Sequence, residues 1–109
     1  MKKLDDRALH HVADYFRALS EPLRLKMLNA LREREHNVGE LTDLCECSQA
    51  NVSKHLGNLF DAGIVSKRKE GLNVFYRVSD ETIFELCETV CQKLESQFSE
   101  KSKLISRGK

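Results

Sequence analysis

The sequence predicts a mainly α-helical domain with a small β-hairpin, in the order helix, helix, helix, helix, hairpin, helix. The chain is rich in the helix formers Leu, Ala, Glu, Lys and Arg. Apolar residues recur at steps of three and four along most of its length, as on the buried face of a helix, whereas residues 64–78 read as strand, glycine turn and strand. Its 109 residues are about one domain's worth. We therefore expect one domain over residues 1–100, followed by a basic, frayed tail over residues 101–109.

The composition excludes several classes of protein. Hydrophobic residues make up 40% of the chain, enough for one modest core and too much for a disordered chain. Apolar runs stay far below the ~20 residues that span a bilayer, and Asp5 and Asp6 stand where a signal peptide needs an apolar stretch. We expect a soluble, cytoplasmic protein with no membrane partner. We do not expect an enzyme, because the sequence shows no nucleophile–base arrangement and no glycine-rich loop that could hold a phosphate.

Two amphipathic helices are expected in the first third of the chain. The first covers residues 4–19, with a stripe of Leu9, Val12, Ala13, Phe16 and Leu19. Ser20 is expected to cap the second helix, and Pro22 fits its first turn, where a missing N–H costs nothing. The second stripe consists of Leu23, Met27, Leu28 and Leu31, and residues 32–36 read as a polar exit.

A pair of short helices with a tight turn follows. Asn37 and Glu40 have the spacing of a capping box, which predicts a helix to about residue 44. Ser48 is the next cap candidate, and Gly63 ends the helix that it opens. The expected buried face of that helix is Val52, Leu56, Leu59 and Phe60. The turn over residues 45–48 gives the pair helix-turn-helix spacing.

The hairpin leads into a last long helix, capped by Ser79 or Asp80. The apolar side of this helix carries Ile83, Leu86, Cys87, Val90, Cys91, Leu94 and Phe98. A domain this small cannot bury two long striped helices alone, so we expect a homodimer formed through the first and last helices.

Polar and basic side chains of the second short helix and the hairpin predict contact with double-stranded DNA. Gln matches adenine in the major groove, an Ala methyl packs on thymine, and Ser and Lys reach bases or phosphates. The basic first arm of the hairpin suits phosphates or the minor groove. The candidate residues are Gln49, Ala50, Ser53, Lys54, Asn58, Lys67, Arg68 and Lys69. A solvated polar surface is the alternative interpretation.

Several segments, in order and at matching spacing, resemble the ArsR/SmtB family of bacterial winged-helix repressors over residues 8–95. They are ALSEPLR at 18–24, SQANVSKHL at 48–56, AGIV at 62–65, KEG at 69–71 and FY at 75–76. The resemblance implies a winged helix-turn-helix homodimer that binds operator DNA without a cofactor. It also implies release by an inducer, often a thiophilic metal or metalloid. His55 is expected to be structural, and Arg24 is expected to hold a phosphate or an internal carboxylate.

The known inducer sites of the family are missing from this chain. A Cys-x-Cys pair would fall on Asn37 and Gly39. Cysteines of the family's recognition helix, which corresponds to the helix expected after Ser48, would fall on Asn58 and Ala62. A zinc site of the last helix would fall on Asp80, Thr82, Lys93 and Ser96.

This chain instead carries Cys45 and Cys47 at the turn, and Cys87 and Cys91 one helical turn apart on the last helix. Thiolates favour soft ions such as As(III), Sb(III), Cd(II), Pb(II), Cu(I) or Zn(II), so we expect sensing at these cysteines, with As(III) as the first candidate. The alternatives are thiol chemistry with an oxidant or sulfane sulfur, a regulator whose cysteines only pack, and a winged-helix module that docks a protein.

Overall fold

The computed structural model describes residues 3–98 and divides the chain into two compact units, one ending at Ser79 and the other starting at Asp80. The first unit contains α1 (Asp6–Ala18), α2 (Pro22–Glu33), β1 (His36–Asn37), α3 (Val38–Cys45), α4 (Gln49–Asp61), β2 (Val65–Glu70) and β3 (Asn73–Val78). The second contains α5 (Thr82–Phe98). The expected order of helices and hairpin is confirmed.

The first two helices begin differently from expectation. Asp5 caps α1, because its carboxylate accepts a hydrogen bond from the Ala8 backbone N–H. Pro22 occupies the first turn of α2 as predicted, but the cap position is Glu21. Ser20 is not the cap: its hydroxyl donates to the Arg17 carbonyl and closes the end of α1 instead.

A short third strand, absent from the predicted hairpin, precedes α3. His36 and Asn37 pair antiparallel with Tyr76 and Phe75, so the sheet has the order β1-β3-β2. The polar exit expected at residue 36 is wrong, since His36 is buried and contacts Glu40 at 3.2 Å. The capping box is confirmed: Glu40 N–H donates to Asn37 Oδ1, and Asn37 N–H donates to Glu40 Oε1. The latter bond holds the pKa of Glu40 below its usual value.

In the core of the first unit, α4 packs against α2 and α3. Its largest fully buried side chains are Met27, Leu41, Leu56, Leu59, Val52 and Val65. Ser48 caps α4 through a bond from Asn51 N–H, as predicted. Gly63 follows the helix end with φ of 78°, a conformation that favours glycine. Phe60 does not belong to the buried face, because its side chain is 39% exposed.

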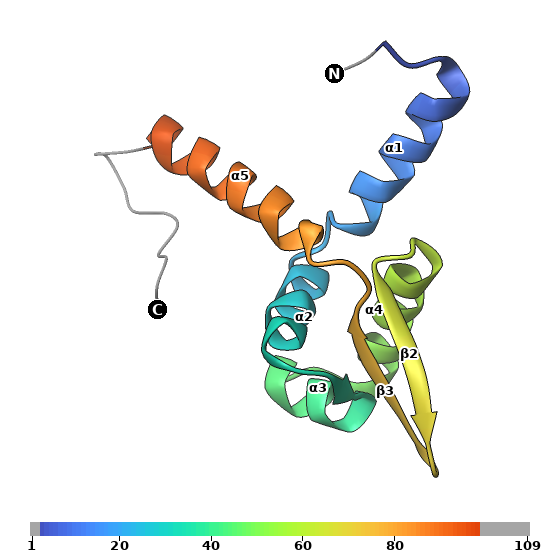
Figure 1. Cartoon of the computed structure of the whole chain (residues 1–109). Helices are drawn as coiled ribbons and strands as arrows, with labels where there is room; N and C mark the ends of the chain where they lie inside the picture. The colour runs from blue at the N-terminus through green and yellow to red at the C-terminus, as the bar shows by residue number, and fades with distance from the viewer. Residues whose placement is uncertain (1–2, 99–109) are drawn as a thin grey trace. The chain divides into compact units, whose positions relative to one another are not determined.

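Strands β2 and β3 form the hairpin, and each is longer than β1. Val65 pairs with Val78 at one end and Glu70 with Asn73 at the other, which leaves Gly71 and Leu72 as the turn. Gly71 has φ of 62°, as a tight hairpin turn requires. Figure 1 shows the hairpin running alongside α4, with its tip extending beyond α3 and α4.

Helix α5 begins after Asp80, whose carboxylate accepts a hydrogen bond from the Thr82 backbone N–H. Of the two expected caps, Asp80 therefore makes a side-chain bond to the first residue of α5, while the Ser79 hydroxyl pairs with Ser66. The basic tail expected over 101–109 lies outside the described residues. No helix in the described part of the chain is long and apolar enough to cross a membrane.

The capping box predicts a measurable stability difference. We expect Asn37→Ala to lower the free energy of unfolding in urea by about 1 kcal/mol, because the Glu40 N–H loses its acceptor. Asn37→Ser keeps a side-chain oxygen at the same position and should retain most of that stability. Equal losses in the two variants would contradict a capping role for this side chain.

Candidate functional site

The outer face of α4 presents polar side chains at its N-terminal end. Gln49, Ala50, Ser53 and Lys54 are all exposed, because burial of Val52, Leu56 and Leu59 turns the opposite side of the helix to solvent. These predicted positions lie together over the first two turns. Asn58 continues the row toward the other end, but it is half-buried and lines a pocket there.

The three basic residues of β2 have different surroundings. Lys69 is exposed. The Lys67 ammonium lies 4.4 Å from the centre of the Phe60 ring on α4. Arg68 donates to Glu35 at 2.8 Å and to Glu70 at 2.9 Å, and these bonds raise its pKa. All three residues are exposed, but Lys67 and Arg68 also contact protein groups.

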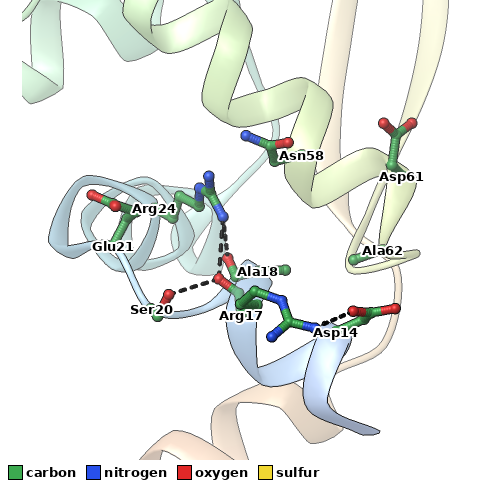
Figure 2. Close-up of a pocket in the computed structure, with 9 residues that line it drawn as sticks. All are labelled: Asp14, Arg17, Ala18, Ser20, Glu21, Arg24, Asn58, Asp61 and Ala62. Atoms are coloured by element: carbon green, nitrogen blue, oxygen red, sulfur yellow. Dashed lines mark hydrogen bonds and ion pairs between the residues drawn. The ribbon is translucent and has the colours of Figure 1, made fainter. Parts of the chain in front are cut away.

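Arg24 connects the start of α2 with the end of α1 and with α4. Its Nε donates to His55 Nδ1 at 2.9 Å, which confirms the structural role expected for His55. Its Nη1 donates to the carbonyls of Arg17 and Ala18, as Figure 2 shows. The partners expected for Arg24 were a phosphate or a carboxylate, whereas in the structure it binds an imidazole and two helix-end carbonyls.

Arg24 also borders an open pocket between these three helices (Figure 2), which the sequence did not indicate. The lining residues come from the end of α1, the start of α2 and the end of α4: Asp14, Arg17, Ala18, Ser20, Glu21, Arg24, Asn58, Asp61 and Ala62. Arg17 pairs with Asp14, and this contact holds the pKa of Asp14 below its usual value. Three acidic and two basic residues line the pocket, so charged groups of both signs face it.

Cys45 and Cys47 flank the turn between α3 and α4. Glu46 adopts a left-handed conformation with φ of 55°, and the Cys47 N–H donates to the Thr42 carbonyl. Cys45 is buried, and burial raises the pKa of its thiol. Cys47 is half-buried. The two sulfurs therefore differ in access although they are two residues apart.

Cys87 and Cys91 lie one turn apart on α5, and both are half-buried. Burial raises the pKa of the Cys87 thiol, and the neighbouring Cys91 adds to this effect. The pair offers two sulfur donors on one helix face. Within residues 3–98, no group of three or more His, Cys, Asp and Glu side chains is placed to hold a metal.

Comparison with known proteins gives a consistent result. Residues 21–67 match the family described as bacterial regulatory protein, arsR family. The chain is 39% identical over 74 residues to a probable mercury resistance operon repressor of Streptomyces lividans, covering 68% of this chain and 59% of that protein. It is 35% identical over 79 residues to a biofilm growth-associated repressor of Agrobacterium fabrum, covering 72% of this chain and 68% of the relative.

A solved structure supports the fold. The homodimeric winged helix-turn-helix DNA-binding domain of a possible ArsR-family regulator from Mycobacterium bovis superposes with a TM-score of 0.75 at 27% identity, covering 97% of this chain and 100% of that fragment. The expected winged helix-turn-helix fold is confirmed. The matched part of the chain spans 59% of the length of the Streptomyces lividans relative and 68% of the length of the Agrobacterium fabrum relative.

The difference between the cysteines predicts an order of alkylation. At pH 7 we expect iodoacetamide to modify Cys45 several-fold more slowly than Cys47, because burial limits access and the raised pKa lowers the thiolate fraction. The Cys45 rate should rise as the pH approaches 9, as measured by peptide mass spectrometry. Urea-unfolded protein is the control, in which the two rates should converge. Equal rates in the folded protein would contradict the burial of Cys45.

Proposed function

The chain belongs to the ArsR family of bacterial regulatory proteins, and from this we propose that it is a homodimeric transcriptional repressor that binds operator DNA. The observation that carries the proposal is the outer face of α4, where Gln49, Ala50, Ser53 and Lys54 are exposed while the opposite face is sealed in the core. Relatives and structural neighbours are DNA-binding regulators and not enzymes.

In this proposal the N-terminal half of α4 enters the major groove. Gln49 reads a base edge through its amide, and the Ala50 methyl packs against thymine. Ser53 and Lys54 hold base edges or phosphates, and Asn58 lies at the margin of the contact. Lys69 contacts a phosphate from the hairpin, which runs alongside α4 (Figure 1). Lys67 and Arg68 lie on the same arm with protein partners of their own.

The proposed dimer uses apolar surface that one chain leaves in water. On α1, the side chains of Leu9, Val12 and Phe16 are 45%, 38% and 52% exposed. On α5, Val90 and Phe98 are 47% and 43% exposed. Both helices carry this surface as a stripe, which is typical of a helix that packs against a partner. The neighbour from Mycobacterium bovis is homodimeric, which supports a homodimer for this chain.

DNA binding is tested by anisotropy titrations on DNA from the gene's own upstream region. The wild-type protein should bind with an affinity that falls steeply with salt, because phosphate contacts release counterions. Gln49→Ala should cost ~1–3 kcal/mol and relax sequence preference at one base pair. Lys54→Gln should weaken binding to all sequences alike. Asn29→Ala, at an exposed position of α2, is the control; absence of sequence-specific binding by the wild type would overturn the proposal.

For the inducer, we propose a thiophilic ion that binds Cys87 and Cys91, with As(III) as the first candidate. The pair supplies two thiolates from one helix face, and such donors select soft ions. A relative named for mercury resistance supports this class of ligand. The raised pKa of Cys87 weakens the alternative of a reactive, low-pKa thiolate that responds to oxidant or sulfane sulfur. Cys47, which is half-buried, is a further candidate ligand, and buried Cys45 is the least accessible of the four.

The inducer acts because it has a higher affinity for the form of the dimer that does not bind DNA. Its affinity for the DNA-binding form is lower. A coupling free energy of ~1–3 kcal/mol corresponds to a loss of ~5–150-fold in DNA affinity. Because thiols bind such ions as thiolates, a divalent inducer such as Cd(II) should bind more tightly as the pH rises.

The sensing role is tested with the double variant Cys87→Ser/Cys91→Ser. It should bind DNA like the wild type and remain bound when stoichiometric As(III) or Cd(II) is added, because serine hydroxyls are poor ligands for soft ions. The matched control is Cys45→Ser/Cys47→Ser, which separates the two pairs. A normal response of the α5 variant would exclude Cys87 and Cys91 as the site, and a normal response of a cysteine-free variant would exclude thiol sensing altogether.

A further inference from the structure

Arg68 spans the whole width of the small sheet. It lies on β2 opposite Phe75 of β3, the central strand. Its guanidinium lies 5.0 Å from the centre of the Phe75 ring. Beyond that ring it reaches Glu35, which directly precedes β1, with Nη2 2.7 Å from the Glu35 carboxylate. One side chain of an edge strand is thereby tied to the other edge of the sheet.

All three nitrogens of this guanidinium are engaged with carboxylates. Nε and Nη2 contact Glu35 at 2.8 and 2.7 Å, and Nη1 contacts Glu70 at 2.9 Å. Two carboxylates thus offset the positive charge of Arg68, which weakens its attraction for a phosphate. The planar fork of arginine fits this arrangement, with two nitrogens on one carboxylate and a ring face against its plane.

We propose that Arg68 is a positioning residue of the hairpin, which it fixes to the segment between α2 and α3 through Phe75 and Glu35, and that it is not a phosphate ligand. This inference rests on the proposed DNA-binding function. Both Arg68 and Lys69 are exposed, but the charge of Arg68 is paired with Glu35 and Glu70. The inference therefore assigns the direct phosphate contact of this arm to Lys69.

The connection matters because the short strand β1 gives the hairpin little pairing at this edge of the sheet. Strand β1 contributes only His36 and Asn37 to the sheet, and the hairpin tip extends well beyond that pairing (Figure 1). Alternation along β2 puts Val65 and Lys67 on the face toward α4, and Arg68 on the opposite, outer face. Arg68 therefore braces the face of the hairpin that the core does not hold.

The decisive comparison is between Glu35→Gln and Glu33→Gln, which remove the same charge at exposed or half-exposed positions two residues apart. If Arg68 positions the hairpin, Glu35→Gln weakens DNA binding relative to Glu33→Gln, by about threefold to fivefold for the loss of an ion pair of this kind. If Arg68 instead contacts phosphate, removing its competing carboxylate strengthens binding. The two roles thus predict opposite signs, and tighter binding by Glu35→Gln overturns the proposal.

Substitution of Arg68 itself gives a second readout. Arg68→Lys keeps the charge and loses the fork, so for a positioning residue it should weaken binding as much as Arg68→Gln does. Neither should change the salt dependence, whereas Lys69→Gln should reduce the slope of log K against log salt by about 0.9. Near-wild-type binding by Arg68→Lys together with a reduced slope for Arg68→Gln would identify a phosphate ligand and overturn the inference.

Amide hydrogen exchange of residues 65–78 separates this inference from the proposed function. Glu35→Gln and Arg68→Lys should both speed exchange in the hairpin, and Glu33→Gln should not, whether or not the protein binds the DNA tested. Unchanged exchange in both variants overturns the bracing role. Failure of the wild-type protein to bind any upstream DNA overturns the proposed function alone.

Discussion

Burial of Val52, Leu56 and Leu59 determines what α4 offers to a partner. These side chains are at most 1% exposed, and a helix whose stripe is sealed in this way cannot rotate without opening a cavity in the core. The opposite face is consequently fixed in direction, and Ser48 fixes where that face begins. Arg24 adds a polar restraint, because its bond to His55 ties the middle of α4 to the start of α2. A surface that reads DNA needs this kind of rigid support from the scaffold.

The parts of the fold that follow from local rules could be predicted from the sequence. Helix periodicity, the capping box at Asn37, the cap at Ser48 and the glycines at 63 and 71 each depend on residues within a few positions of one another. The errors concern choices between neighbours or contacts across the fold. Ser20 closes the preceding helix instead of opening the next, and β1 is too short for a strand pattern, since its two residues pair only because β3 lies beside them.

The candidate site likewise has features that local sequence patterns predict and features that depend on contacts across the fold. The exposed row on α4 follows from periodicity, and the one-turn spacing of Cys87 and Cys91 follows from helix geometry. The partners of Arg68 do not follow from a local pattern, because Glu35 is 33 residues away in sequence. The sequence of a basic strand is the same whether its charges contact DNA or carboxylates. Arg24 and His55 are likewise 31 residues apart. A sequence pattern can predict that a residue is charged and on the surface, and only the fold decides which partner its charge meets.

The separation of functions between the two units constrains how an inducer can act. The proposed DNA contacts all belong to the unit that ends at Ser79, whereas Cys87 and Cys91 lie on α5 in the other. An ion held by α5 therefore has no direct competition with DNA for a side chain. In the proposed dimer, its effect must come from a difference in affinity between two arrangements of the protein. A ligand that binds both arrangements equally shifts nothing, however tightly it binds. If α1 takes part in the proposed dimer, Arg24 offers a route from that helix to the DNA-contacting helix, because it connects the end of α1 to α4.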